Sequence, residues 1–213
     1  MDYRKLVIDS CVRLYDSNLT VGTWGNISIR DPDTGYVYIT PSGMDYYSCL
    51  PEDINLYKPD GTLVEGFRTP SIEKNLHLSI YRARPDVGGV IHAHPLYSSV
   101  FGVLEEDIPA VTEEFAQLIG KKVCCSRYAL PGTDELAGAV VDALGAGAAV
   151  ILPNHGTVCV GKDIESAFAI AEVLEKACHI YHLARSLGKP RIVSDEHVEI
   201  MYDFRNNIYG QRE

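Results

Sequence analysis

The stretch Val90-Ile91-His92-Ala93-His94-Pro95 places two histidines one residue apart at the end of an apolar run. In an extended strand alternate side chains share a face, so His92 and His94 would emerge together, about 7 Å apart along the backbone. Pro95 cannot donate to a strand ladder and is expected to end the strand. A lone histidine is usually a half-buried, hydrogen-bonded residue. A pair can share one metal ion, but a catalytic ion needs at least a third ligand.

His155 could supply that third ligand. It lies in Pro153-Asn154-His155-Gly156, between the apolar segments 148–152 and 157–160, and so also follows a buried strand. Three histidines from two strand ends would form the open ligand set of a catalytic divalent ion. A nitrogen-only set favours zinc, although cobalt, nickel or manganese could substitute. A structural turn histidine is the alternative interpretation of His155.

Glu73 is the best candidate for acid/base chemistry, because a carboxylate beside a metal can exchange a proton with a substrate. The alternative is that a glutamate in a first helical turn only complements the helix dipole. His77 lies four residues on and shares a helix face with Glu73, which makes it a rival ligand. His179 and His182 have i,i+3 spacing on a long helix but no third partner nearby, so they are interpreted as surface or core histidines.

The whole pattern predicts one α/β domain, residues 1–213, because no linker, repeat or low-complexity segment interrupts it. Helical spacing of apolar residues predicts helices at 3–18, 72–81, 96–103, 111–120, 134–144 and 164–187, and one from 194. Alternating or continuous apolar runs predict strands at 27–30, 36–39, 54–58, 62–64, 87–94, 123–126, 148–152 and 157–160. The first four strands form an antiparallel meander, and Ser71 or Thr69 would cap the helix at 72–81.

Composition argues against several kinds of partner. The net charge of −10 disfavours binding to nucleic acid or to an anionic membrane through bulk electrostatics. No apolar run approaches the roughly 20 residues of a membrane span, and the first residues lack a signal-peptide pattern, so a cytoplasmic location is expected. The six cysteines show no C-x-x-C spacing and are interpreted as reduced, mostly buried residues. A redox role for the adjacent Cys124 and Cys125 stays open.

Three short loops combine hydroxyl groups with glycine or proline. They are Gly22-Thr23-Trp24-Gly25-Asn26, Thr40-Pro41-Ser42-Gly43 and Thr69-Pro70-Ser71. The last one opens a predicted helix, and backbone N–H groups at a helix N-terminus together with hydroxyl donors can bind an anion without a lysine. A phosphate could therefore bind to this acidic chain. Each loop alone is only a turn, and their spacing does not show that they meet.

In order and spacing these motifs resemble the class II aldolase/adducin family, and most closely its L-fuculose-1-phosphate aldolase branch. The matching motifs are Gly22-Thr23-x-Gly25-Asn26-x-Ser28, Thr40-Pro41-Ser42-Gly43, Pro70-Ser71-x-Glu73, His92-x-His94, Asn154-His155-Gly156 and the terminal Tyr209-Gly210. The resemblance implies a three-layer α/β/α sandwich with a central, mainly antiparallel sheet. It also implies a homotetramer with active sites between subunits and one Zn²⁺ per subunit, held by His92, His94 and His155.

The resemblance assigns roles to further residues. Glu73 would lie near or on the metal in the resting state and would act as the acid/base when substrate arrives. Tyr209 would reach a neighbouring subunit's site and donate a proton to the aldehyde oxygen. The positions that match the family's phosphate-binding residues are Thr23, Asn26, Ser42, Gly43 and Ser71.

Two departures from the fuculose-phosphate branch concern specificity. Ile72 stands where those enzymes carry a second serine, which removes a phosphate donor. Glu113 lies in Thr112-Glu113-Glu114-Phe115, where they carry a tyrosine that lines the aldehyde pocket. We assign Glu113 and Tyr128 to that pocket and expect the pocket to differ from that of the fuculose-phosphate enzymes, which leaves sugars other than fuculose open.

The implied activity is a zinc-dependent, reversible cleavage of a ketose 1-phosphate into dihydroxyacetone phosphate and a short aldehyde, through an enediolate stabilised by a Lewis acid. The substrate would be L-fuculose 1-phosphate or a related deoxypentulose or ribulose 1-phosphate. Three alternatives are a pentulose-5-phosphate 4-epimerase, a methylthioribulose-1-phosphate dehydratase and a non-enzymatic, adducin-like interaction module. The complete set of His92, His94, His155 and Glu73 argues against the last of these.

Overall fold

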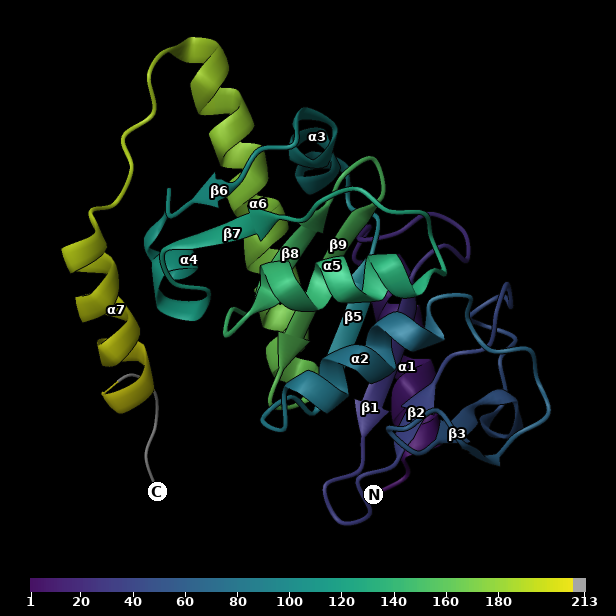
Figure 1. Cartoon of the computed structure of the whole chain (residues 1–213). Coiled ribbons are helices and arrows are strands. Elements are labelled where there is room, and N and C mark those ends of the chain that lie inside the picture. The colour runs from purple at the N-terminus through teal and green to yellow at the C-terminus, as the bar shows by residue number, and fades with distance from the viewer. Residues whose placement is uncertain (209–213) are drawn as a thin grey trace.

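Strands of one sheet run through the centre of the structure in the order β4-β3-β2-β1-β5-β9-β8-β7-β6 (Figure 1). The computed structural model describes residues 1–208 of the chain. The strands are β1 (Asn26–Arg30), β2 (Val37–Ile39), β3 (Asn55–Tyr57), β4 (Leu63–Glu65), β5 (Gly89–Ala93), β6 (Ile108–Pro109), β7 (Lys122–Cys125), β8 (Ala149–Leu152) and β9 (Gly156–Gly161). Every neighbouring pair is antiparallel except β7 and β8. The prediction of a mainly antiparallel sheet is therefore confirmed.

Five of the seven α-helices in the described residues begin where the sequence supplies a capping side chain. The seven helices are α1 (Tyr3–Asp16), α2 (Lys74–Ala83), α3 (Leu96–Leu104), α4 (Glu113–Leu118), α5 (Asp134–Leu144), α6 (Ile164–Leu187) and α7 (Asp195–Asn207), with a 3-10 turn at Pro51–Asp53. The side chains that accept a hydrogen bond from a first-turn backbone N–H are Asp2, Thr112, Thr133, Asp163 and Ser194. These bonds satisfy amides that lack a partner inside the helix and fix where each helix starts.

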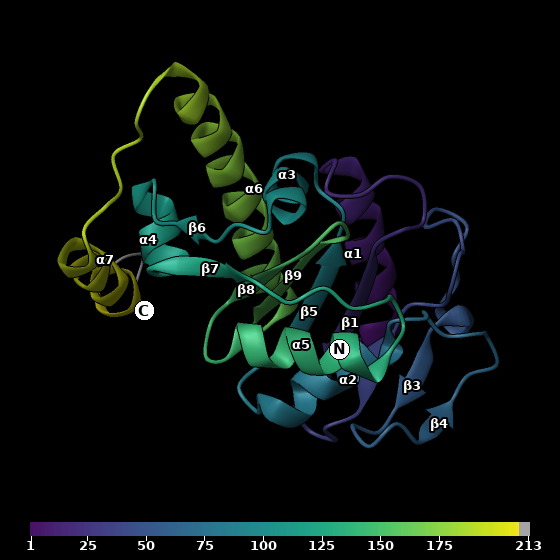
Figure 2. The ribbon, with the colours of Figure 1, turned by 45° about the horizontal axis from the view of Figure 1, so that its top comes forward.

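Helices cover both faces of the sheet. On one face α1 packs on β1, α6 on β5 and β9, and α3 on β8. Their apolar side chains form one core, which includes Leu14, Phe101 and Phe168. On the other face α2 and α5 lie side by side (Figures 1 and 2) and form a second core that includes Leu76 and Val140. The three-layer α/β/α sandwich predicted from the sequence is confirmed.

The strand β5 crosses the middle of this sandwich. All of its residues are buried, because it pairs with β1 on one side and β9 on the other and is covered on both faces. Close approach of α6 also requires Gly89, since a Cβ there would lie 2.8 Å from the Cα of Ile164. The buried strand therefore carries the histidine pair to a fixed position at its end.

The predicted elements differ from the structure in small ways. The strand ends at Ala93, one residue before the position expected, so His94 follows the strand. The cap predicted for the helix at 72–81 was wrong: α2 starts at Lys74 with Glu73 as the N-cap residue, and the hydroxyl of Ser71 accepts a hydrogen bond from the Glu73 backbone N–H at 3.2 Å. The short strand β6 and the 3-10 turn were not predicted, because each has too few residues to show a period.

Helix α6 is the longest helix of the described residues and reaches past the sheet toward one end of the molecule (Figure 1). Neither it nor any other described helix is both long and apolar enough to span a membrane. The connection after α6 leads back to α7, which packs against α4 beyond the β7 side of the sheet (Figure 2).

Candidate metal centre

Pairing between β5 and β9 brings the histidines together. Ala93 lies opposite Thr157, so the turn before β9 is held over the end of β5. Gly156 allows the close approach, because a Cβ there would meet the Ala93 carbonyl oxygen at 2.2 Å and the His94 ring at 3.0 Å. Consequently His155, in the turn between β8 and β9, faces the histidine pair.

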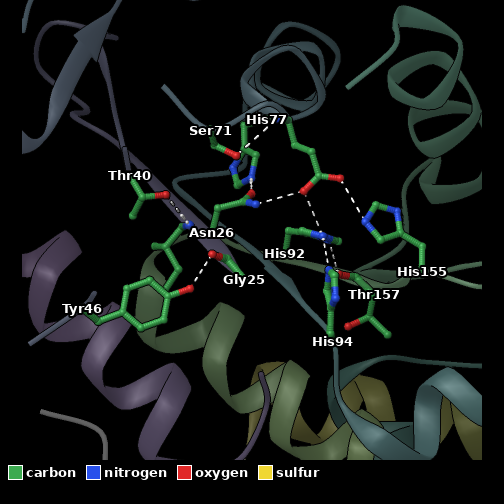
Figure 3. A network of polar contacts seen from close by, with 12 residues as sticks. Gly25, Asn26, Thr40, Tyr46, Ser71, His77, His92, His94, His155 and Thr157 are labelled. Atoms are coloured by element: carbon green, nitrogen blue, oxygen red, sulfur yellow. Dashed lines mark hydrogen bonds and ion pairs between the residues drawn. The ribbon is translucent and has the colours of Figure 1, made fainter. Parts of the chain in front are cut away.

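The three imidazole rings of His92, His94 and His155 form a compact triangle (Figure 3). Their centroids are 4.7 to 5.0 Å apart, and one ring nitrogen from each lies within 4.8 Å of the others. His92 is fully buried, while His94 and His155 are half-buried and face a pocket. This is the spacing in which one small cation can contact all three rings.

Glu73 completes the cluster from the N-terminus of α2. Its Oε2 atom lies 3.0 Å from Nε2 of His92, and its Oε1 atom lies 3.2 Å from Nε2 of His155. The side-chain amide of Asn26 donates to Oε2 at 2.9 Å. The carboxylate is only 3% exposed, so these three residues form its polar surroundings.

The pKa values of the cluster follow from burial and charge. Burial opposes the ionisation of Glu73, but the electrostatic interaction with His92 and the hydrogen-bonding contacts with His155, His92 and Asn26 outweigh it and hold the Glu73 pKa far below its ordinary value. Burial, together with the electrostatic influence of His92 and His155, lowers the pKa of His94 to about 3. Glu73 is therefore a carboxylate and His94 a neutral imidazole, which are the protonation states that bind metals.

The donor set fits a divalent transition metal. The Nδ1–H group of His92 donates to the Thr157 carbonyl at 3.0 Å, which leaves the Nε2 lone pair for a ligand. Nε2 of His94 lies only 2.9 Å from that atom, a spacing that a shared cation stabilises. Within residues 1–208, Nδ1 of His155 is buried without a hydrogen-bond partner. These residues are thus arranged to hold an ion.

The rival histidines lie elsewhere. His77 is fully buried, and its two ring nitrogens face Asn26 and Ser28 in place of the cluster. The ring of His179 stacks on Tyr97 with centroids 3.7 Å apart, and His182 lies 6.1 Å from the same tyrosine ring. None of the three belongs to the ligand cluster of the described chain.

The three hydroxyl-containing loops meet beside the metal centre. The Ser42 backbone N–H donates to the Thr69 carbonyl at 2.9 Å, and the Ser71 N–H donates to the Thr40 carbonyl at 3.2 Å, which joins the second and third loops. Together with the first loop they line a pocket of about 440 Å³. All five residues expected to bind phosphate lie on it, namely Thr23, Asn26, Ser42, Gly43 and Ser71.

Of the two residues assigned to the aldehyde pocket, one lines the pocket beside the histidine cluster and the other does not. Tyr128 lines the same pocket. Glu113 is an exposed residue at the start of α4 and does not line it within one protomer. Tyr209 lies outside the described residues. A larger hollow of about 1020 Å³ lies at the opposite end of β1 and β5, near Arg30 and Gly88, and contains none of the expected site residues.

Sequence reasoning assigned no role to some residues at the site. Trp24 is exposed at the pocket, with its ring 6.2 Å from that of His94. Thr157 fixes the His92 tautomer through its backbone carbonyl, which no side-chain motif can show. The contact between His77 and Asn26 joins a helix to a strand 51 residues earlier. Its only sequence signal was the i,i+4 spacing of Glu73 and His77.

Comparison with known proteins agrees with this fold and identifies the family. Residues 5–182 match the family described as Class II Aldolase and Adducin N-terminal domain. The chain is 37% identical over 187 residues to the 5-deoxy-D-ribulose 1-phosphate aldolase of Bacillus thuringiensis serovar kurstaki, a match that covers 88% of this chain and 87% of that protein. It is 30% identical over 207 residues to the L-fuculose phosphate aldolase of Escherichia coli K12, covering 97% of this chain and 94% of that protein.

Solved structures show the same similarity. A structure of L-fuculose 1-phosphate aldolase superposes with a TM-score of 0.92 at 37% sequence identity, covering 95% of both chains. The fold and the metal centre thus define an enzyme of the class II, metal-dependent aldolase type. The chain belongs to the class II aldolase and adducin family.

Proposed function

We propose that this chain is a zinc-dependent aldolase that reversibly cleaves a ketose 1-phosphate into dihydroxyacetone phosphate and a short aldehyde. The observation that carries the proposal is the convergence of the Glu73 carboxylate on three histidines beside a pocket lined by hydroxyl groups. Similarity to two aldolases named for sugar 1-phosphates supports this class of substrate.

In this proposal His92, His94 and His155 hold the ion, and their nitrogen donors favour Zn²⁺. When bound, the metal would act as a Lewis acid toward the oxygen atoms of the three-carbon unit. The alternative of covalent catalysis through a lysine imine is not supported, because no lysine lines the pocket formed by the described residues.

The hydroxyl-containing loops would bind the phosphate group. Thr23, Ser42 and Ser71 offer hydroxyl donors, and Gly43 and the N-terminus of α2 offer backbone N–H groups. Neutral donors of this kind bind a phosphate without a large basic surface, in keeping with the net charge of −10. This arrangement would hold the phosphate end of the substrate while its carbonyl end faces Glu73.

Glu73 would transfer the proton at C3, the carbon whose bond to C4 breaks during cleavage. During cleavage the bond between C3 and C4 breaks, the C4 hydroxyl loses its proton to become the aldehyde, and the electron pair remains on C3. Glu73, once it has taken up a proton from solvent, would then deliver that proton to C3 and complete dihydroxyacetone phosphate, while the proton lost from the C4 hydroxyl passes to solvent. In the synthetic direction the Glu73 carboxylate would remove that proton. In a homotetramer with shared sites, Tyr209 of a neighbouring subunit would exchange the proton at the aldehyde oxygen.

The aldehyde distinguishes the candidate substrates. By carbon count, 5-deoxyribulose 1-phosphate leaves acetaldehyde beside dihydroxyacetone phosphate, whereas fuculose 1-phosphate leaves lactaldehyde. Ile72, Trp24 and Tyr128 expose apolar or aromatic groups at the pocket, which favours a deoxy sugar. Glu113 would contribute only from a neighbouring protomer. The single domain of residues 1–213 and the cytoplasmic location stay predictions.

The test is to incubate the zinc-loaded protein with dihydroxyacetone phosphate and acetaldehyde, glycolaldehyde or lactaldehyde, and to identify products by mass spectrometry. We expect a ketose 1-phosphate from at least one aldehyde. No product with any aldehyde would contradict the proposal. In that event, epimerisation of a pentulose 5-phosphate, or one dehydrated product from methylthioribulose 1-phosphate, would identify the alternative enzymes, and inactivity toward all of these would favour an adducin-like module.

A further inference from the structure

A buried chain of hydrogen bonds leads from Glu73 through Asn26 and His77 to Ser28, and Figure 3 shows the contact between Asn26 and His77. The Asn26 amide nitrogen lies 2.9 Å from Glu73 Oε2, and the Asn26 amide oxygen lies 2.5 Å from Nε2 of His77. On the far side of the ring, Nδ1 of His77 lies 2.6 Å from the Ser28 hydroxyl. His77 and Ser28 have no exposed surface, and Asn26 is 6% exposed. Each of these three hydrogen bonds thus joins helix α2, or its N-cap residue Glu73, to strand β1.

The chemistry of the groups fixes the direction of each hydrogen bond between Glu73 and His77. The Glu73 carboxylate only accepts, so Asn26 must turn its NH₂ group toward it and its oxygen toward His77. That oxygen needs a donor, which must be the Nε2–H group of His77. Because burial, and next the electrostatic influence of His92, lower the pKa of His77 to about 3, the ring is neutral and Nδ1 accepts from the Ser28 hydroxyl.

Strand β1 anchors the far end of this chain. The Tyr81 hydroxyl donates to the Ser28 carbonyl at 2.9 Å and also lies 3.0 Å from the Ser28 hydroxyl. Since Tyr81 and His77 are both on α2, one helical turn apart, the serine is held between two side chains of one helix. His77 has both nitrogens engaged in this arrangement and cannot serve as a metal ligand without breaking it.

The side-chain amide of Asn26 has one more N–H donor than this network of hydrogen bonds uses. Its NH₂ group carries two hydrogens, and Glu73 is the one partner of that group among the described residues. The residue also lines the pocket in which we place the substrate phosphate. If the side-chain amide of Asn26 were flipped, its NH₂ group would no longer donate to Glu73 or face the pocket. The amide oxygen would then face the Glu73 carboxylate, which also only accepts.

We infer that His77 is a positioning residue, which fixes the amide of Asn26 so that this one side chain holds the Glu73 carboxylate and presents its second N–H to the substrate. The inference rests on the proposed aldolase function for its kinetic consequence. A buried structural histidine would stabilise the fold equally well with either tautomer. The positioning role requires the proton on Nε2.

The first test needs no substrate. Nitrogen-15 chemical shifts of the histidine rings in the zinc-loaded protein report which nitrogen of His77 carries the proton, with His77→Gln used to assign the signal. We expect the Nε2–H tautomer at neutral pH. An Nδ1–H tautomer would overturn the inference, whatever the protein catalyses.

The second test measures steady-state kinetics with metal content determined for each variant. His77→Leu cannot donate to Asn26 and should lower kcat by about 10- to 100-fold with zinc content unchanged, the range typical of residues that orient catalytic groups. His77→Gln can donate from its amide NH₂ and accept from Ser28, so it should recover most of that loss. A His77→Gln enzyme as impaired as His77→Leu would overturn the inference, as would a fully active His77→Leu enzyme.

A double-mutant cycle shows whether His77 acts through Asn26. If it does, His77→Leu should add little to the kcat loss already caused by Asn26→Ala, because the group to be positioned is gone. Additive losses would show that His77 acts by another route and would contradict the inference. His197→Gln, at an exposed position on α7, serves as the control for replacing a histidine. A wild-type enzyme that fails to make a ketose phosphate removes the proposed function but leaves the tautomer result intact.

Discussion

Oε2 of Glu73 lies 3.0 Å from Nε2 of His92, although one residue begins helix α2 and the other lies on strand β5. The same nitrogen is the atom that a metal would bind, because Nδ1 of His92 is engaged by the Thr157 carbonyl. A carboxylate in this position can contact the metal in the resting enzyme and can turn to a substrate proton when ligand atoms replace it. In the proposed mechanism, metal binding and proton transfer would therefore depend on the same few atoms.

Removal of any one histidine of the cluster should release the metal. His92→Ala, His94→Ala or His155→Ala leaves two nitrogen ligands, too few for a stable site. Elemental analysis should show about one zinc per chain in the wild type and almost none in these variants. His197→Ala is the matched control and should keep its zinc. A variant that retains a full complement of metal would exclude its histidine from the ligand set.

Acid should destabilise the metal-free protein through His77. Burial lowers its pKa from 6.5 to about 3 in the folded state, so below pH 6.5 the unfolded chain binds a proton that the folded chain does not. Stability is therefore lost as the pH falls from 6.5 toward 3, by about 1.4 kcal/mol per pH unit for this group. Urea titrations at several pH values should show a shallower dependence for His77→Gln. Equal slopes in the two proteins would mean that His77 does not remain neutral.

The turn that carries His155 depends on Gly156. A Cβ at this position would lie 2.2 Å from the Ala93 carbonyl oxygen, so Gly156→Ala must push β9 away from β5. We expect a loss of about 1–3 kcal/mol in the free energy of unfolding, together with weaker zinc binding. Gly138→Ala is the control, because that helix position faces open space and should gain about 0.4–1 kcal/mol. Unchanged stability and metal affinity in Gly156→Ala would contradict the close packing of the two strands.

Ile72 tests the phosphate pocket. It is 65% exposed at the pocket, where a serine would add a hydroxyl donor beside the expected phosphate. One such hydrogen bond contributes about 0.5–1.5 kcal/mol, so Ile72→Ser should lower the KM for the phosphorylated substrate by about two- to tenfold with kcat nearly unchanged. Ile72→Ala, which makes the same space without a donor, is the control. An equal fall of the KM in both variants would mean that the added space lowers the KM, and that a new hydrogen bond to the phosphate does not.

The sequence predicted most of the fold because its signals were local. Asp163 and Gly188 lie on either side of a regular apolar pattern and mark the two ends of α6. The buried apolar run 148–152 corresponds closely to β8. The start of α2 was wrong, because a hydroxyl at Ser71 resembles a cap although the helix begins after Glu73. Local patterns cannot distinguish two capping candidates a few residues apart.

The candidate site was predictable only in its residue types. The strand-end position of His92 and the turn position of His155 suggested a shared ion, but the β5 and β9 register that brings them together is a long-range property. The link from His77 to Asn26 joins residues that no local pattern relates. Tyr209 lies outside the described residues, so its expected role stays a prediction.

Exchange of the dihydroxyacetone phosphate proton with solvent tests the central proposal most directly. In D₂O, without any aldehyde, the zinc-loaded wild type should replace one hydroxymethyl proton by deuterium, as followed by proton NMR, since Glu73 would remove and return it. Glu73→Gln should keep its zinc and slow this exchange by at least about 100-fold. Wild-type exchange in a zinc-loaded Glu73→Gln enzyme, or no exchange in the wild type, would contradict the proposed chemistry.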